Sequence, residues 1–186
     1  MRRFLCALIL AVFLSLLCGG AMADRSVTIT FTGDVTLGSE EAKKKQDSSF
    51  VSYAAQKGYD YFFANFQEMF QSDDLTVVNL EGPLTDSSKQ ENKAKTYRFR
   101  GSADYANILT GAGIDAANLA NNHCPTDFGN QGYNATKAAL EDAGVGWFAN
   151  TKVYIFEKDG LRIAFIGLNS TKVNGQKAWF RKEIPR

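Results

Sequence analysis

Three groups of polar residues in this sequence have side chains of the types that bind metal ions or move protons. Asp34 and Glu81 are hard anionic oxygen donors. The Asn122 side chain offers a carbonyl oxygen, and His123 offers an imidazole nitrogen. This mixture suits Mn²⁺, Fe²⁺, Zn²⁺ or Mg²⁺ better than a thiolate site does. A divalent metal ion held there would activate water and neutralise a phosphate-like or carboxylate-like substrate.

Each of these groups follows a segment with the pattern of a β-strand. Residues 26–31 alternate apolar and polar side chains, residues 75–80 form a second strand that Gly82 stops, and residues 115–120 form a third. In an open α/β sheet, ligands bind outside the carboxyl ends of the strands. We therefore expect the three groups to meet at one edge of a sheet.

Helical patterns lie between the expected strands. Asp60 and Ser102 stand where helices would begin, and Gly113 and Gly144 stand just past expected helix ends. The expected helices cover residues 49–57, 60–71, 102–112 and 129–143. Residues 39–49 are polar and predict an exposed loop or frayed helix.

A hairpin follows the last expected helix. Strands at 152–157 and 161–168 are joined by a tight turn at 158–160. The order of strand, helix, strand, helix, strand, helix and hairpin predicts an α/β fold with a mostly parallel sheet at its start. Residues 85–96 are polar and lysine-rich, which favours a solvated loop.

The composition is that of an ordinary globular chain. Of the 186 residues, 45% are hydrophobic and 22% are charged, and the formal net charge is +1. So balanced a charge argues against a general nucleic-acid binder, which needs a broad basic surface. We expect no nucleic-acid partner.

The first 23 residues have the three-part layout of a secretory signal peptide. Arg2 and Arg3 precede an apolar run from Phe4 to Cys18, and the small-x-small triplet 21–23 follows. The run is shorter than the roughly 20 apolar residues of a membrane-spanning helix. We expect cleavage after Ala23 and a location outside the cytoplasm: periplasmic, cell-surface or extracellular. Cleavage would change the formal charge to −1 and leave Cys124 as the one cysteine.

Each candidate residue also has a structural interpretation. Asp34 could form a turn or cap a helix, and Glu81 could end a strand in solvent. Asn121 could bond the loop backbone, and Asp127 could cap the following helix. His123 is the one histidine of the chain, and a lone histidine is more often structural than catalytic.

The neighbouring residues His123 and Cys124 also raise the question of a Cys-His nucleophile. The partners in such sites are normally distant in sequence, because adjacent side chains cannot usually adopt the required relation. We therefore interpret Cys124 as a small loop residue.

The ordered motifs resemble those of the CapA family, the bacterial capsule synthesis group linked to poly-γ-glutamate. The resemblance covers about residues 26–170 and rests on Phe31-Thr-Gly-Asp34, Val78-Asn-Leu-Glu-Gly-Pro83, and Leu119-Ala-Asn-Asn-His123 with Asp127-Phe-Gly129. It implies a layered α/β sandwich similar to the calcineurin-like metallophosphoesterases, with metal ligands at strand ends.

The resemblance also implies roles for individual residues. Asp34 resembles the first-strand metal ligand and Glu81 the second-strand acid, with Asn79 as a helper. Asn122 and His123 resemble the asparagine–histidine pair of the third motif. We expect a metal site of Asp34, Glu81, Asn122 and His123, with His123 and Asp127 as the catalytic residues.

The function that the resemblance implies is capsule or poly-γ-glutamate synthesis by an exported protein with a metal-dependent, hydrolase-like site. Expected partners are the capsule polymer and a membrane biosynthesis complex. The family carries a later His-Trp-Gly-like motif, and this chain has no histidine after His123. We therefore expect residues 24–186 to be the N-terminal part of a CapA-like domain, incomplete at its C-terminus.

The missing motif leaves an alternative open. The protein could hold or export an anionic polymer without catalysis, using the lysine-rich loops at 43–45 and 89–95.

Overall fold

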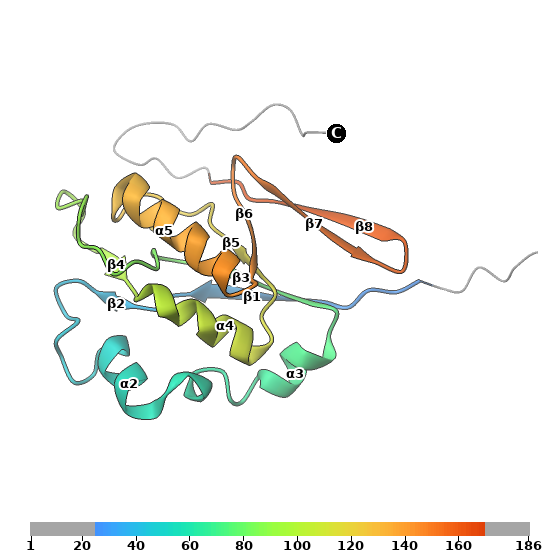
Figure 1. The fold of residues 1–186 in the computed structure, drawn as a ribbon, viewed down its shortest axis with the longest axis horizontal. Helices are drawn as coiled ribbons and strands as arrows, with labels where there is room; N and C mark the ends of the chain where they lie inside the picture. Colours follow the sequence, from blue (N-terminus) through green and yellow to red (C-terminus); the bar gives the residue numbers. More distant parts are fainter. Residues whose placement is uncertain (1–24, 170–186) are drawn as a thin grey trace, which may run out of the picture.

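The computed structural model describes residues 25–169, and its centre is a four-stranded parallel sheet (Figure 1). The strand order is β1-β3-β5-β6, so each strand lies beside the next strand of this sheet along the chain. The four are β1 (Ile29–Val35), β3 (Leu75–Leu80), β5 (Ala116–Asn118) and β6 (Gly146–Phe148). The predicted α/β fold with a parallel sheet is confirmed. The expected signal peptide, residues 1–23, lies outside the described residues.

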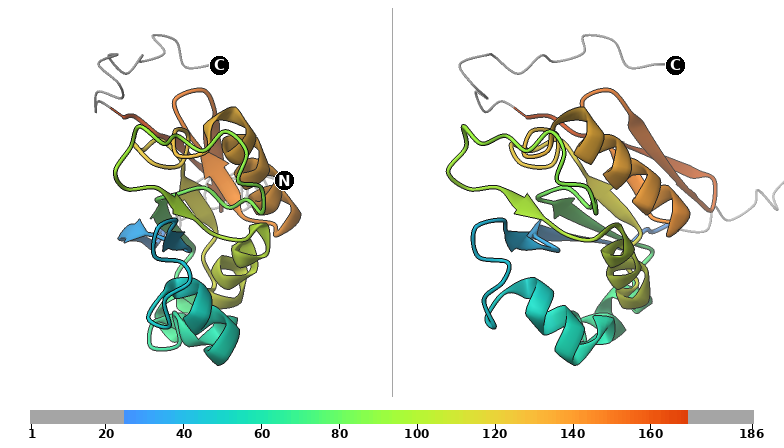
Figure 2. Two further views of the ribbon diagram at one scale, coloured as in Figure 1. Left: turned by 90° about the vertical axis from the view of Figure 1, so that its left-hand side faces the viewer. Right: turned by 60° about the vertical axis from the view of Figure 1, so that its left-hand side comes forward.

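Helices connect the parallel strands, and α4 and α5 lie across the same face of the sheet (Figures 1 and 2). No helix within residues 25–169 combines the length and the apolar character that a membrane span requires. The helices are α2 (Phe50–Lys57), α3 (Gln67–Ser72), α4 (Ala106–Ala112) and α5 (Gly129–Asp142), with 3₁₀ turns η1 (Tyr59–Tyr61) and η2 (Ala103–Tyr105).

The central strand β3 is covered on both faces, which explains its nearly continuous apolar sequence. Val78 and Leu80 point into the core formed with the helices. Leu75 and Val77 point to the opposite face, where they pack in a second cluster that includes Phe165. That cluster is supplied by the antiparallel hairpin of β7 (Val153–Lys158) and β8 (Leu161–Ile166). The result is a layered sandwich of helices, sheet and hairpin.

Several sequence-based boundaries are wrong. The first strand, expected over residues 26–31, instead covers Ile29–Val35, because a register shift between Phe31 and Asp34 lets pairing with β3 resume. The expected helix at 60–71 is divided into η1 and α3, and Asp60 lies inside η1 rather than at a helix cap. Between them Phe62 stacks on Phe50 with a centroid distance of 4.3 Å, so aromatic packing overrides the helical pattern.

Three short strands were not predicted. The sequence of β6 has only three residues, too few to show a period. The other two, β2 (Ser39–Glu40) and β4 (Phe99–Arg100), form a small antiparallel ribbon. Its pairing partners lie about sixty residues apart, so no local pattern indicates it. The ribbon matters because Phe99 also contacts the imidazole of His123.

Alanine substitutions of the two glycines near the end of α4 should change the stability of the protein in opposite directions. Gly113 adopts a left-handed conformation with φ 86° and ends the helix, whereas Gly111 is exposed inside it. Gly113→Ala should destabilise the protein by about 1 kcal/mol or more, because a β-carbon disfavours that conformation. Gly111→Ala should stabilise it by about 0.5–1 kcal/mol by lowering the entropy of the unfolded chain. Urea unfolding of both variants checks this; shifts of the same sign would contradict it.

Candidate functional site

The carboxyl ends of β1 and β3 bring the first two groups together. Asp34 is paired in register with Asn79, and the Asn79 side-chain amide donates a hydrogen bond of 2.6 Å to the Asp34 carboxylate. Glu81 is the first residue after β3, and its backbone N–H bonds to the carbonyl of Val35 at 2.9 Å. The carboxylates of Asp34 and Glu81 therefore face the same edge of the sheet.

Asparagine amides extend this edge to β5. The side-chain oxygen of Asn79 accepts hydrogen bonds from Asn118 at 2.9 Å and from Asn121 at 3.2 Å. Asn121 also accepts from the backbone N–H groups of His123 at 3.0 Å and Cys124 at 2.7 Å. The structural interpretation of Asn121 is confirmed, since it shapes the loop that carries His123. Asn118 was missed by sequence reasoning, although an amide at the end of a buried strand was a usable signal.

The imidazole of His123 lies between two carboxylates. Its Nδ1 is 2.9 Å from Oδ2 of Asp127, and its Nε2 is 3.7 Å from Oε1 of Glu81. We assign the proton to Nδ1, because Oδ2 of Asp127 lies within hydrogen-bond distance of Nδ1, whereas Oε1 of Glu81 lies too far from Nε2 to accept a hydrogen bond. Nε2 then presents its lone pair toward Glu81. The ring of Phe99 packs edge-on against the imidazole at 4.9 Å, which fixes the ring plane.

Asp127 lies behind His123 and is completely buried. Its Oδ2 also accepts the backbone N–H of Phe99 at 2.8 Å, and its Oδ1 forms an ion pair with Lys95. The structure thus places Asp127 where it orients His123 rather than where it would touch a substrate. It does not cap α5, because the residue at the cap position is Phe128, which makes no side-chain cap bond.

The loop at 85–96 is not simply solvated. Lys95 is only 18% exposed at its side chain and reaches into the loop that carries His123. Its ammonium bonds to the carbonyl of Asn122 at 2.8 Å and to the Thr126 hydroxyl at 3.1 Å. The contact between Asn122 and Lys95 is therefore made by the backbone carbonyl of Asn122. No sequence pattern had connected Lys95 with the site.

The electrostatics at the open side of the site are unfavourable to an ionised Glu81. Burial raises the pKa of the Glu81 carboxyl, and the neighbouring Asp34 carboxylate raises it further, while a positive charge on His123 would lower it. Two acids and one imidazole therefore share this edge. Within residues 25–169, no three His, Cys, Asp or Glu side chains are grouped closely enough to hold a metal ion as they stand.

Cys124 is not part of this chemistry. Its side chain is completely buried in the main core, and burial raises the pKa of its thiol to about 12. A thiol in that environment stays protonated and is not a nucleophile at neutral pH. The interpretation of Cys124 as a structural residue therefore stands, and the Cys-His nucleophile is excluded.

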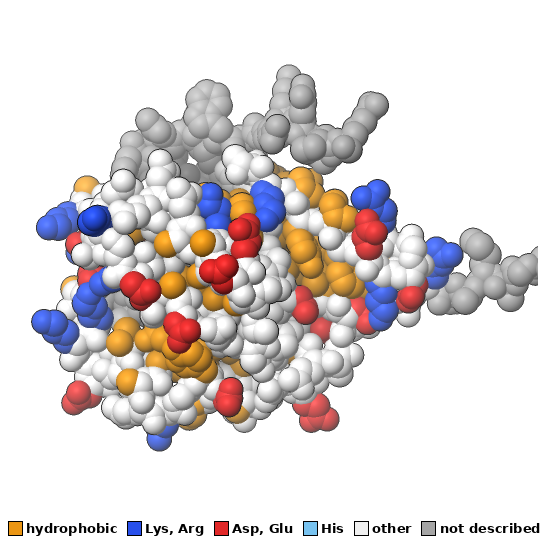
Figure 3. Space-filling model, in the orientation of Figure 1, with side chains coloured by type: hydrophobic (Ala, Val, Ile, Leu, Met, Phe, Trp, Pro, Cys, Tyr) orange, Lys and Arg blue, Asp and Glu red, His pale blue; other side chains and the backbone are white. Residues whose placement is uncertain are grey.

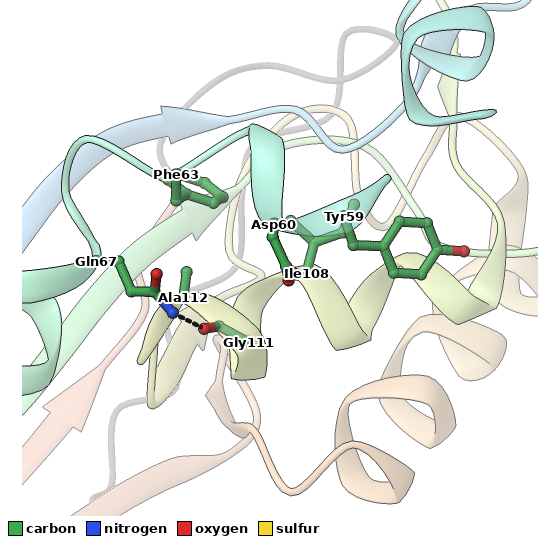
Figure 4. Close-up of a pocket in the computed structure, with 7 residues that line it drawn as sticks. All are labelled: Tyr59, Asp60, Phe63, Gln67, Ile108, Gly111 and Ala112. Atoms are coloured by element: carbon green, nitrogen blue, oxygen red, sulfur yellow. Dashed lines mark hydrogen bonds between the residues drawn. The ribbon is translucent and has the colours of Figure 1, made fainter. Parts of the chain in front are cut away.

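A small cavity lies away from the site, between η1, α3 and α4 (Figure 4). Gln67 lines it and donates to the carbonyl of Gly111 at 2.9 Å. The cavity has a volume of about 10 Å³, which is room for one water molecule at most. It is therefore a packing defect and not a second ligand site.

The lysine-rich loops offer less free charge than their sequence indicates. Lys43 pairs with Glu40, Lys44 pairs with Glu41, and Lys95 pairs with Asp127. On the face drawn in Figure 3, Lys and Arg side chains stand among Asp and Glu side chains rather than in one basic track. These contacts give no support to a cationic polymer-binding surface on these loops.

The model of a protein family described as bacterial capsule synthesis protein PGA_cap matches residues 28–184 of the chain. The match covers most of the 186 residues and includes β1, β3, β5 and the loop that carries His123. All the strand-end residues described above lie inside it. No curated protein matches the chain.

The burial of Cys124 predicts a thiol that does not react in the folded protein. A thiol-specific alkylating reagent at pH 8 should leave Cys124 unmodified, because little thiolate forms and the side chain is inaccessible. In denaturant the same residue should react completely. Mass spectrometry of the peptide that contains Cys124 measures both. Rapid modification under native conditions would contradict the burial.

The raised pKa of Glu81 predicts a stabilising substitution. Because the folded-state pKa lies above the unfolded-state value, ionised Glu81 lowers stability at neutral pH, and this effect vanishes as the pH falls through the folded-state pKa. In a chelating buffer, Glu81→Gln should raise the urea midpoint at pH 7 and leave it unchanged at pH 4. Asp47→Asn, in an exposed loop, is the control and should change neither. A lower midpoint for Glu81→Gln at pH 7 would refute this.

Proposed function

The chain belongs to the bacterial capsule synthesis protein family PGA_cap and so has a role in capsule synthesis; from this premise we propose a metal-dependent, hydrolase-like site for it. The proposed ligands are Asp34, Glu81, the side-chain oxygen of Asn122 and the Nε2 atom of His123. We further propose that the protein is exported, which the layout of residues 1–23 supports.

One observation carries the proposal: the alignment of Asp127, His123 and Glu81. Nδ1 of His123 lies 2.9 Å from Oδ2 of Asp127, and the opposite ring nitrogen, Nε2, lies 3.7 Å from Oε1 of Glu81. In metal sites, a ligating histidine almost always gives its other N–H to a carboxylate or carbonyl, which fixes its tautomer and raises its basicity.

The residues present fit a divalent cation by their chemistry. Mn²⁺, Fe²⁺ and Zn²⁺ all bind carboxylate oxygens and imidazole nitrogens. Mg²⁺ would bind the carboxylate oxygens of the same site. Burial and, after it, repulsion by the Asp34 carboxylate raise the pKa of Glu81, and a cation between the two carboxylates would remove that repulsion. Asp34 is exposed at the end of its strand, so an ion from solvent would reach its carboxylate. When bound, the ion would polarise a substrate oxygen and supply an activated water.

The side chains of the site have separate tasks in this proposal. Asn79 holds Asp34 in place through its 2.6 Å hydrogen bond. Asp127 keeps the imidazole in one tautomer, and Phe99 keeps its plane. Because Lys95 neutralises Asp127, that carboxylate adds little negative charge to the open side of the site, where an anionic substrate would approach.

The substrate class that we propose is a phosphate ester or an amide-linked anionic polymer such as poly-γ-glutamate. Both present anionic oxygens that a divalent cation would neutralise. A membrane biosynthesis complex would be the source of such a polymer, and we propose it as the partner of the exported domain. Family membership and the carboxylate-rich strand ends support this proposal.

The proposal predicts one bound divalent metal ion per chain. After loading with Mn²⁺ or Zn²⁺ and exhaustive dialysis, elemental analysis should find close to one equivalent in the wild-type protein. Asp34→Ala combined with His123→Ala should remove it, because two of the four proposed ligands are lost. Asp47→Ala, an exposed acid away from the strand ends, is the matched control and should retain the metal.

Two results would overturn this proposal. One is a wild-type protein, folded by circular dichroism, that retains no metal. The other is equal metal content in the double variant and the wild type, together with equal polymer production when each gene replaces a family member in a capsule-forming host.

A further inference from the structure

Lys95 lies at the centre of the contacts behind His123, although neither the sequence motifs nor the family match assigns it a role. We propose that Lys95 is a positioning residue of the site: its ammonium fixes Asp127 so that His123 presents a bare Nε2 toward Glu81. The use of that nitrogen as a ligand rests on the proposed function, whereas the positioning itself is a property of the folded chain.

The two carboxylate oxygens of Asp127 have different partners. Oδ1 pairs with Lys95, while Oδ2 accepts Nδ1–H of His123 at 2.9 Å and the backbone N–H of Phe99 at 2.8 Å. With Oδ1 held, the carboxylate cannot rotate without breaking an ion pair in a fully buried place. The acceptor for His123 therefore stays at one position, which holds both the tautomer and the ring orientation.

The ammonium of Lys95 is itself held from several directions. It donates to the Asn122 carbonyl at 2.8 Å and to the Thr126 hydroxyl at 3.1 Å, in addition to Asp127. All three partners belong to the loop that carries His123. The Nζ of Lys95 also lies 3.4 Å from Nδ1 of His123. With the proton assigned to Nδ1 and donated to Asp127, no lone pair is left on Nδ1 to accept from Lys95. The cation therefore acts on His123 through Asp127.

The loop does not depend on the Lys95 side chain alone for its position. On one side of Lys95, the backbone N–H of Asn92 bonds to the carbonyl of Asp127 at 2.8 Å, and on the other side Phe99 bonds to the Asp127 side chain. The Arg98 guanidinium also bonds to the Lys95 carbonyl. None of these contacts uses the Lys95 ammonium, so a Lys95→Met variant is designed to separate positioning of His123 from docking of the loop.

The experiment uses the single histidine of the chain as its reporter. The full-length protein, carrying an affinity tag without histidine, is labelled with ¹⁵N, and long-range ¹H–¹⁵N correlation at pH 8.5 shows which ring nitrogen of His123 bears the proton. The variants are Lys95→Met, Lys95→Arg and the control Lys93→Met, which alters an exposed lysine two residues away. Zn²⁺ affinity is measured by calorimetry on the same samples.

We expect the wild type and Lys93→Met to show the Nδ1–H form alone. Lys95→Met should show a mixture of both tautomers and a Zn²⁺ dissociation constant 10- to 100-fold higher, the range usual for loss of a residue that orients a metal ligand. Lys95→Arg keeps the positive charge, so it should partly restore both the Nδ1–H tautomer and the Zn²⁺ affinity. A folded Lys95→Met protein with the wild-type tautomer and affinity would overturn the proposal and leave Lys95 a structural anchor.

A second measurement uses only the wild-type protein, so it tests the positioning role of Lys95 even if Lys95→Met does not fold. In the wild-type protein the Lys95 ammonium protons should exchange slowly enough to be observed and should show a nuclear Overhauser effect to the Nδ1 proton of His123. Absence of that contact in the folded protein would overturn the proposal. If the wild type shows the contact and the tautomer but binds no Zn²⁺, the proposed function fails while the positioning role of Lys95 stands.

Discussion

The buried carboxylate of Asp127 is the constraint around which the site is organised. An ionised acid without solvent is costly unless each oxygen has partners. Asp127 obtains them from three places: an ammonium on Lys95, a backbone N–H on Phe99 and an imidazole N–H on His123. Satisfying one acid thus ties the β3–β4 loop, strand β4 and the β5–α5 loop together at one edge of the sheet.

The parallel sheet provides the second part of the arrangement. Because β1, β3 and β5 run in the same direction, their carboxyl ends meet, and the residues there come together from distant parts of the chain. The Asn79 side chain links these ends, since its amide donates to Asp34 and its oxygen accepts from Asn118 and Asn121. The acids and the imidazole therefore stand on a hydrogen-bonded frame rather than on independent loops.

The sequence was sufficient for the parts of this structure that depend on local pattern and on general topology. Strand β3 was predicted within its observed bounds because burial on both faces makes it an unbroken apolar run, and Gly113 marked the end of α4. The meeting of Asp34, Glu81 and His123 followed from their places at strand ends. The roles of Lys95 and Asn118 could not be predicted in this way. The pairing of Lys95 with Asp127 spans 32 residues, and a lysine in a polar loop has the same local signal whether it is solvated or buried.

A metal site at the strand ends is tested most directly by paramagnetic broadening of the His123 ring signals by Mn²⁺. His123 is the one histidine, so its ring protons are identified by residue type alone, whereas the ring of Tyr154 is first assigned among the seven tyrosines. We predict that one equivalent of Mn²⁺ broadens them beyond detection, while the Tyr154 ring, in the hairpin cluster on the other face of the sheet, remains sharp. His123 signals that stay sharp at one equivalent, or that broaden only together with Tyr154, would contradict a metal site at the strand ends.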